Sequence, residues 1–208
     1  MNKDFEFRQL LRAYRSGVIS EATFETEMRS LENGAHSNGA GGFKALGRSY
    51  ASEREAVIKF LEVVSPAETA GGVAVRAWLE VCKTDCIRGG LMMVAERESY
   101  HGRAFAERLK QLGGNVSQQT SEESRKNIEY LRNPNISDYE KLLRGAKRFP
   151  NPEETICPLF EFAELLKEDL QTKEMVKLFA QDELSTLKWQ NSLCAALTEA
   201  QSTQPRAA

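Results

Sequence analysis

Two short segments of the chain recur at nearly constant spacing, and this repeat limits the possible folds more than any other feature. Ser-Pro-Ala-Glu-Thr at 65–69 matches Asn-Pro-Glu-Glu-Thr at 151–155, and Ala-Glu-Arg-Glu at 95–98 matches Ala-Gln-Asp-Glu at 180–183. The two spacings are 86 and 85 residues, so one residue is lost between the copies. The repeat predicts two related helical hairpins that close into one bundle.

Apolar residues recur at intervals of three and four along four long stretches, which is the period of an amphipathic helix. These stretches are 66–83, 86–112, 152–170 and 173–197. Little in the chain favours strands. Two further helical pieces, 122–131 and 138–148, lie in a polar connection long enough to cross the bundle. We therefore predict an all-α fold, an antiparallel four-helix bundle of two repeated hairpins with extra helices.

Composition divides the chain into four regions. We assign them as a helical hairpin at 1–32, a flexible Gly-rich linker at 33–49, the helical bundle at 50–200 and a disordered tail at 201–208. The bundle region opens with an amphipathic stretch at 52–64. We expect this helix to end before Ser65-Pro66, because a residue that precedes proline is disfavoured in the α conformation.

The charge balance excludes several function classes. The chain has 28 Lys and Arg against 30 Asp and Glu, a net charge of -2, so no strong field would attract nucleic acid. No apolar run approaches the roughly 20 residues of a membrane helix, and the acidic N-terminus differs from a signal peptide. We expect a soluble, cytoplasmic protein with no nucleic-acid partner and no membrane partner.

A candidate metal site is centred on Glu98 and His101. They are three residues apart, so a helix would present both from one face to a single ion. If the first hairpin turns near Thr84, Glu68 on the preceding helix lies at nearly the same height along the bundle as Glu98. The repeat makes Glu154 equivalent to Glu68 and Glu183 equivalent to Glu98.

These residues resemble the ligand pattern of the ferritin-like superfamily of rubrerythrin-type diiron proteins, over about residues 65–197. That pattern has a Glu on the first and third helices and Glu-x-x-His on the second and fourth. Carried over by position, the ligands are Glu68, Glu98, His101, Glu154 and Glu183. The resemblance implies two iron ions, with manganese as the alternative, and a diiron oxidase or oxygenase of unknown substrate and unknown electron donor.

Several alternatives remain open at the level of sequence. Thr186 stands where the second His is expected, which favours a non-catalytic helical scaffold with a degenerate metal site. Glu68 and Glu154 each have a capping-box spacing, so each could instead bind the backbone at a helix start. A turn near Thr172 would make Glu161 or Glu164 the third-helix ligand. Two aromatic residues near the site, Tyr100 and Trp78, could pass electrons, although we interpret both as core.

The N-terminal region carries a second resemblance. The sequence Leu-Arg-Ala-Tyr-Arg-Ser-Gly-Val-Ile-Ser-Glu-Ala-Thr-Phe-Glu, at 11–25, resembles the short helical domain known as SHOCT. It has the glycine turn, the Ile-Ser step and the acidic, aromatic second helix of that family. The resemblance implies tethering or oligomerisation, and we expect a homo-oligomer formed through the N-terminal hairpin.

Overall fold

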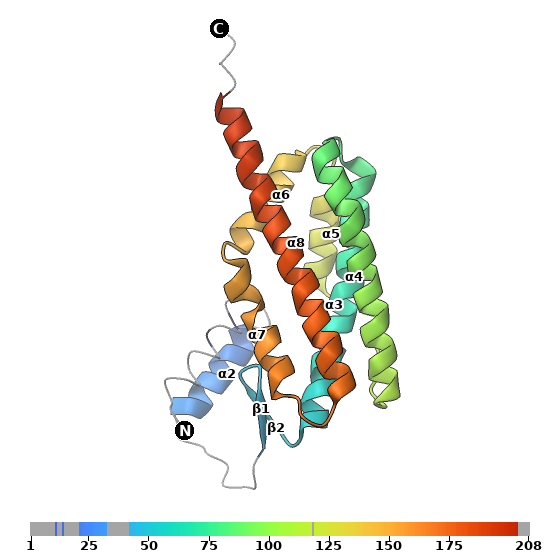
Figure 1. Ribbon diagram of the computed structural model, residues 1–208, viewed down its shortest axis with the longest axis vertical. Coiled ribbons are helices and arrows are strands. Elements are labelled where there is room, and N and C mark those ends of the chain that lie inside the picture. Colours follow the sequence, from blue (N-terminus) through green and yellow to red (C-terminus); the bar gives the residue numbers. More distant parts are fainter. Residues whose placement is uncertain (1–10, 12–13, 15–20, 33–41, 118, 204–208) are drawn as a thin grey trace. The chain divides into compact units, whose positions relative to one another are not determined.

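The described residues of the chain are mostly helical. The structure is a computed structural model that describes residues 11, 14, 21–32, 42–117 and 119–203. The helices are α2 (Glu21–Glu32), α3 (Glu53–Val81), α4 (Asp85–Gln111), α5 (Glu122–Arg132), α6 (Asp138–Arg148), α7 (Pro152–Leu165) and α8 (Leu170–Thr203), and the strands are β1 (Phe43–Ala45) and β2 (Arg48–Tyr50) (Figure 1). The all-α prediction is confirmed at this level, whereas the ferritin-like arrangement stays a prediction.

The chain divides into two compact units. One comprises residues 1–59 and 151–184, and the other comprises residues 60–150 and 185–208. The long helices α3 and α8 each contribute residues to both units. No helix in the described part of the chain combines the length and apolar composition that crossing a membrane requires.

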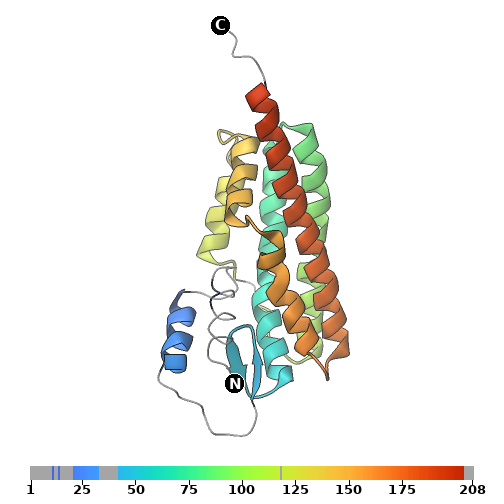
Figure 2. The same cartoon turned by 60° about the vertical axis from the view of Figure 1, so that its left-hand side comes forward.

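In the first unit, a small β-hairpin replaces the end of the predicted flexible linker. β1 and β2 form a small two-stranded hairpin (Figure 2). They pair antiparallel, and Phe43 lies opposite Tyr50. Leu46 and Gly47 connect the strands with φ angles of 51° and 74°. Positive φ at both central residues suits a two-residue hairpin turn, and glycine adopts it readily. The linker prediction is therefore wrong for residues 43–49, and residues 33–41 lie outside the described part.

The same unit has a well-anchored start to α3. The carboxylate of Glu53 accepts hydrogen bonds from the backbone N–H groups of Lys167, Glu168 and Asp169, at 2.8, 3.0 and 2.8 Å. Those groups lie between α7 and α8, so one buried carboxylate ties the beginning of α3 to this turn. The predicted second helix of the N-terminal hairpin is present as α2, and most of the preceding residues lie outside the described part.

In the second unit, α3 and α4 run antiparallel and are joined by the short turn 82–84, as expected (Figure 1). Asp138, at the start of α6, fastens this turn. Its carboxylate accepts hydrogen bonds from the Trp78 indole at 2.8 Å, from the Lys83 and Thr84 backbone at 2.8 and 3.0 Å, and from the Thr84 hydroxyl at 2.9 Å. The adjacent core contains Trp78, Cys82, Ile87, Leu91, Leu142 and Cys194.

Two predicted helix boundaries are wrong. Helix α3 does not end before Ser65 but continues through it, with Pro66 inside the helix. A proline inside a helix removes one backbone hydrogen bond and costs about 3 kcal/mol. Burial of apolar side chains around it, such as Leu61 and Ala70, offsets that cost. The second hairpin turns at 166–169 rather than near Thr172, which lies inside α8.

Candidate metal centre

Glycines bring α3 and α4 close together at the candidate site. A Cβ atom added to Gly71 would collide with the Glu98 carboxylate, and one added to Gly72 would lie 2.7 Å from the Ser99 hydroxyl. On α4, a Cβ atom at Gly102 would lie 2.5 Å from the Thr69 hydroxyl. Glycine within a helix costs up to about 1 kcal/mol relative to alanine. These glycines allow Glu98 to lie against the backbone of α3.

A carboxylate and an imidazole meet in this contact region. The Nδ1 atom of His101 lies 3.4 Å from Oε2 of Glu68. Both residues are nearly removed from solvent, with 4% of His101 and 9% of Glu68 exposed. The structure thus brings together two of the residues that the sequence named as candidate ligands.

Glu98 lies beside the same pair and is half-buried. Burial raises the pKa of its carboxyl group well above the usual range, and the charge of Glu68 and a hydrogen bond with Glu68 raise it further. Two carboxyl groups in contact cannot both ionise easily, so the protonated form of Glu98 is favoured. The two carboxyl groups and the imidazole of His101 form one cluster within the second unit.

The capping alternative for Glu68 is wrong, because Ser65 lies inside α3 and not at a helix start. The Ser65 hydroxyl instead donates to the Gly102 carbonyl oxygen at 3.2 Å, across the α3–α4 contact. Thr69 donates its hydroxyl to the Ser65 carbonyl oxygen at 2.9 Å. The side chains around Glu68 therefore join the two helices, and the Glu68 carboxylate faces His101.

Aromatic side chains shield His101 on the next turn of α4. The ring of Phe105 lies 6.5 Å from the His101 ring, centre to centre, and meets the Phe60 ring edge-on at 6.0 Å. Phe105 is 2% exposed and Phe60 is 8% exposed. This apolar wall keeps water from the imidazole and strengthens electrostatic interactions in the cluster.

The third-helix candidates lie on α7, in the first unit. Glu154 is exposed near the start of α7, and the Asn151 side chain donates to its Oε2 atom at 3.4 Å. Glu164 forms surface ion pairs with Lys173 at 3.2 Å and with Lys177 at 2.9 Å. Glu161 is half-buried and accepts from the Cys157 thiol at 3.4 Å. The earlier turn makes Glu154, rather than Glu161, level with Glu183 along this hairpin.

The fourth-helix candidate, Glu183, is half-buried on α8. Ser185, two residues further along the same helix, accepts a hydrogen bond at 2.7 Å from Arg97, the neighbour of Glu98 on α4. Thr186, in the place of the expected second His, follows directly and is half-buried. Ligation of a metal by Glu154 or Glu183 stays a prediction.

Sequence reasoning missed the residues that shape the site. It identified the carboxylates and the histidine but assigned no role to Gly71 or Gly102, and it considered Ser65 only as a helix cap. The available signal was the Gly71-Gly72 pair inside a strongly helical stretch, since glycine there requires a compensating close contact. Tyr100 also differs from the prediction, because it is 62% exposed and is not a core residue, whereas Trp78 is buried as predicted.

Comparison of the chain with known families, curated proteins and solved structures found no match in any of the three.

Proposed function

We propose that this chain is a ferritin-like metal-binding protein that holds a redox-active ion in the Glu68, Glu98 and His101 cluster. The buried contact between Glu68 Oε2 and His101 Nδ1, at 3.4 Å, carries this proposal. Both side chains lie on helices, which fix ligand positions better than loops do.

The separation of these two atoms suits a shared ion better than a direct hydrogen bond. N–H···O hydrogen bonds in proteins span about 2.7–3.2 Å, so 3.4 Å is long for one. Nitrogen and oxygen ligands lie about 2.0–2.2 Å from a divalent ion, which separates neighbouring ligand atoms by about 3.0–3.5 Å. The observed distance falls in that range.

The donor set favours iron or manganese. Carboxylate oxygens suit manganese, imidazole suits iron, and the cluster contains no thiolate that would select softer metals. Bound iron or manganese would supply one-electron chemistry toward dioxygen or peroxide, as in an oxidase or oxygenase. The protein's own part would be to bind the ion, to exclude water with Phe105 and Phe60, and to release the Glu98 proton when that carboxylate becomes a ligand.

Glu183 is the residue we propose as a further ligand. The internal repeat makes it the equivalent of Glu98, which supports this assignment. The hydrogen bond from Arg97, the neighbour of Glu98, to Ser185 gives further support, because it links α4 to α8 two residues beyond Glu183. A second ion would require Glu154 as a ligand, and Glu154 is exposed. We therefore propose a site for one ion, and a diiron centre would be this site with a second ion added.

Metal analysis of the purified full chain tests the proposal. The protein is loaded with iron(II) without oxygen, desalted and analysed for bound iron, with manganese(II) in parallel. We expect bound metal in the native chain and its loss in Glu68→Gln and His101→Ala. The matched control is Glu96→Gln, an exposed residue of α4 that pairs with Arg76 at 2.8 Å and should retain the metal.

The number of metal ions bound per chain distinguishes a single-ion site from a diiron site. One ion per chain, unaffected by Glu154→Gln, supports the single site, whereas a second ion lost in Glu154→Gln supports the diiron form. Absence of both metals from a folded native chain, checked by circular dichroism, would overturn the proposal in favour of the non-catalytic scaffold.

We also propose that the SHOCT-like region at 1–32 joins copies of the chain into a homo-oligomer. The residues of this region that the structure describes include stacked Tyr14 and Phe24 rings, 4.7 Å apart, which support a helical hairpin. Light scattering tests the proposal, and a monomeric mass for the full chain would exclude it.

A further inference from the structure

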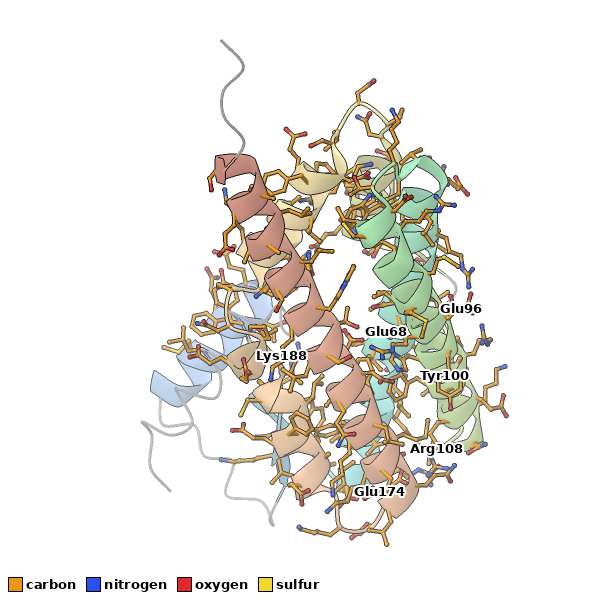
Figure 3. The ribbon with its side chains drawn as sticks, turned by 45° about the horizontal axis from the view of Figure 1, so that its top comes forward. Glu68, Glu96, Tyr100, Arg108, Glu174 and Lys188 are labelled. Carbon is orange, nitrogen blue, oxygen red and sulfur yellow. The ribbon has the colours of Figure 1, made fainter. Side chains whose placement is uncertain are left out.

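Tyr100 is exposed to solvent and also contacts His101, the buried histidine of the candidate metal centre. Its side chain is 62% exposed, yet its ring meets the His101 ring edge-on, with the ring centres 6.0 Å apart. His101 itself is only 4% exposed. A buried metal ligand thus has an aromatic neighbour that a molecule in solution can touch. Figure 3 shows Tyr100 on α4 at a level similar to that of Glu68 on α3.

Other aromatic residues near the cluster do not provide such a route. Phe105 and Phe60 are 2% and 8% exposed, so they shield the imidazole rather than connect it to solvent. Trp78 is buried in the separate core around Cys82 and Leu142, and its indole N–H is bonded to Asp138. Among these residues, Tyr100 alone combines contact with His101 and a largely exposed ring.

The surface around Tyr100 suits contact with another molecule. Met93, which lies seven residues earlier and therefore on the same side of α4, is also 62% exposed. Glu96, one turn before Tyr100, has its charge balanced by Arg76 at 2.8 Å. Tyr100 and Met93 thus leave two apolar side chains exposed on this side of α4, where a small reductant can make contact.

We propose that Tyr100 is the electron-entry residue for the metal held by His101, and that its ring couples an outer-sphere one-electron reductant at the surface to that metal. This inference rests on the proposed function. With iron(III) held by His101, one electron would leave the reductant, which would be oxidised by one unit, and the ferric ion would be reduced by one unit. No bond forms or breaks, no proton moves, and Tyr100 is unchanged at the end.

The test measures the reduction of iron(III)-loaded full-length protein by hexaammineruthenium(II), followed by stopped-flow absorbance and by the loss of the ferric electron paramagnetic resonance signal. We expect Tyr100→Leu to slow reduction about tenfold, which is about 1.4 kcal/mol on the barrier. Tyr100→Phe keeps the ring beside His101 and should reduce at nearly the native rate. Met93→Leu, an equally exposed position on the same face, is the matched control.

Bound iron is measured in every variant before reduction. Equal iron content with slow reduction only in Tyr100→Leu supports the entry role. Native rates in Tyr100→Leu at full iron content would overturn the entry role and leave the proposed function intact. Loss of rate in Met93→Leu as large as in Tyr100→Leu would also overturn it, and failure of the native chain to bind iron would overturn both proposals.

Discussion

The carboxylate of Glu98 occupies the space that a side chain on Gly71 would fill. The absence of a Cβ atom at position 71 therefore determines where a candidate metal ligand lies. The contact joins the middle of α3 to the middle of α4, within a unit in which Glu68 and His101 are also brought together.

Gly71→Ala should weaken metal binding without unfolding the chain. The added methyl group displaces the Glu98 carboxylate, and changes that reorient a ligand typically cost about 10- to 100-fold in metal affinity. Manganese(II) titration calorimetry measures the effect. The control is Gly89→Ala on α4, where nothing lies within 4 Å of the added Cβ atom, so affinity should not change. Native affinity in Gly71→Ala would show that Glu98 is not a ligand.

The two prolines of the repeat should respond differently to alanine. Pro66 lies inside α3, whereas Pro152 is the first residue of α7. Pro66→Ala restores a backbone donor inside a helix and should raise the free energy of unfolding by about 1–3 kcal/mol. Pro152→Ala should give no gain, because the first turn of a helix has no intrahelical partner for that N–H group. Urea unfolding compares the two, and a gain only in Pro152→Ala would contradict the assignment.

These prolines also explain where prediction from sequence succeeded and failed. The periodicity of apolar residues identified α4, α5 and α6 nearly to the residue, because their ends carry local signals such as Ser137 and Gly113. Ser65-Pro66 is also a local signal for a helix boundary, yet α3 continues past Pro66 because tertiary packing favours the longer helix. Local rules could not reveal that burial on both sides of Pro66 outweighs one lost hydrogen bond.

The candidate site was predictable in part for a similar reason. Glu98 and His101 follow from helical spacing alone, and Glu68 follows from the position of the turn after α3, which was correct. The environment of these residues depends on contacts between distant residues, such as Ser65 with Gly102 and His101 with Phe105. No spacing rule encodes such contacts, so the burial of His101 and the exposure of Tyr100 required the structure.

Asp138 should make stability depend on acid pH. Burial raises the pKa of its carboxyl group, but the hydrogen bonds from Trp78, Lys83 and Thr84 outweigh this and lower the pKa below the usual value. The stabilisation is therefore complete above the unfolded pKa of about 3.9 and is lost as pH falls through the folded value.

Asp138→Asn tests this dependence. We expect it to lower the free energy of unfolding by roughly 2 kcal/mol at pH 7, because hydrogen bonds to a charged acceptor are lost. The difference from the native chain should shrink as pH falls below about 4. Urea unfolding at several pH values measures it, with exposed Glu129→Gln on α5 as the control. A difference that stays constant down to pH 2 would show that the charge of Asp138 is not involved.

Lys141 should be a source of instability at neutral pH. It is 2% exposed, and its Nζ atom has no hydrogen-bond partner among the described residues. Burial lowers its pKa, while the nearby Asp138 and Cys82 act in the opposite direction. The Trp78 ring lies 6.0 Å from Nζ, and Asp138 already accepts four hydrogen bonds from neutral donors. The carboxylate is therefore satisfied without the lysine.

Lys141→Met should raise the free energy of unfolding by about 1 kcal/mol or more at pH 7, since replacing buried charge by apolar volume is often stabilising. Because the folded pKa is lowered, the native chain is destabilised while this lysine is charged in the unfolded state. That cost disappears as pH rises from the folded pKa to about 10.4, so the advantage of the variant should shrink over that interval. Lys126→Met, at an exposed position paired with Glu122, is the matched control and should give no gain. A variant less stable than the native chain at pH 7 would mean that attraction to Asp138 and Trp78 exceeds the cost of burying the ammonium group.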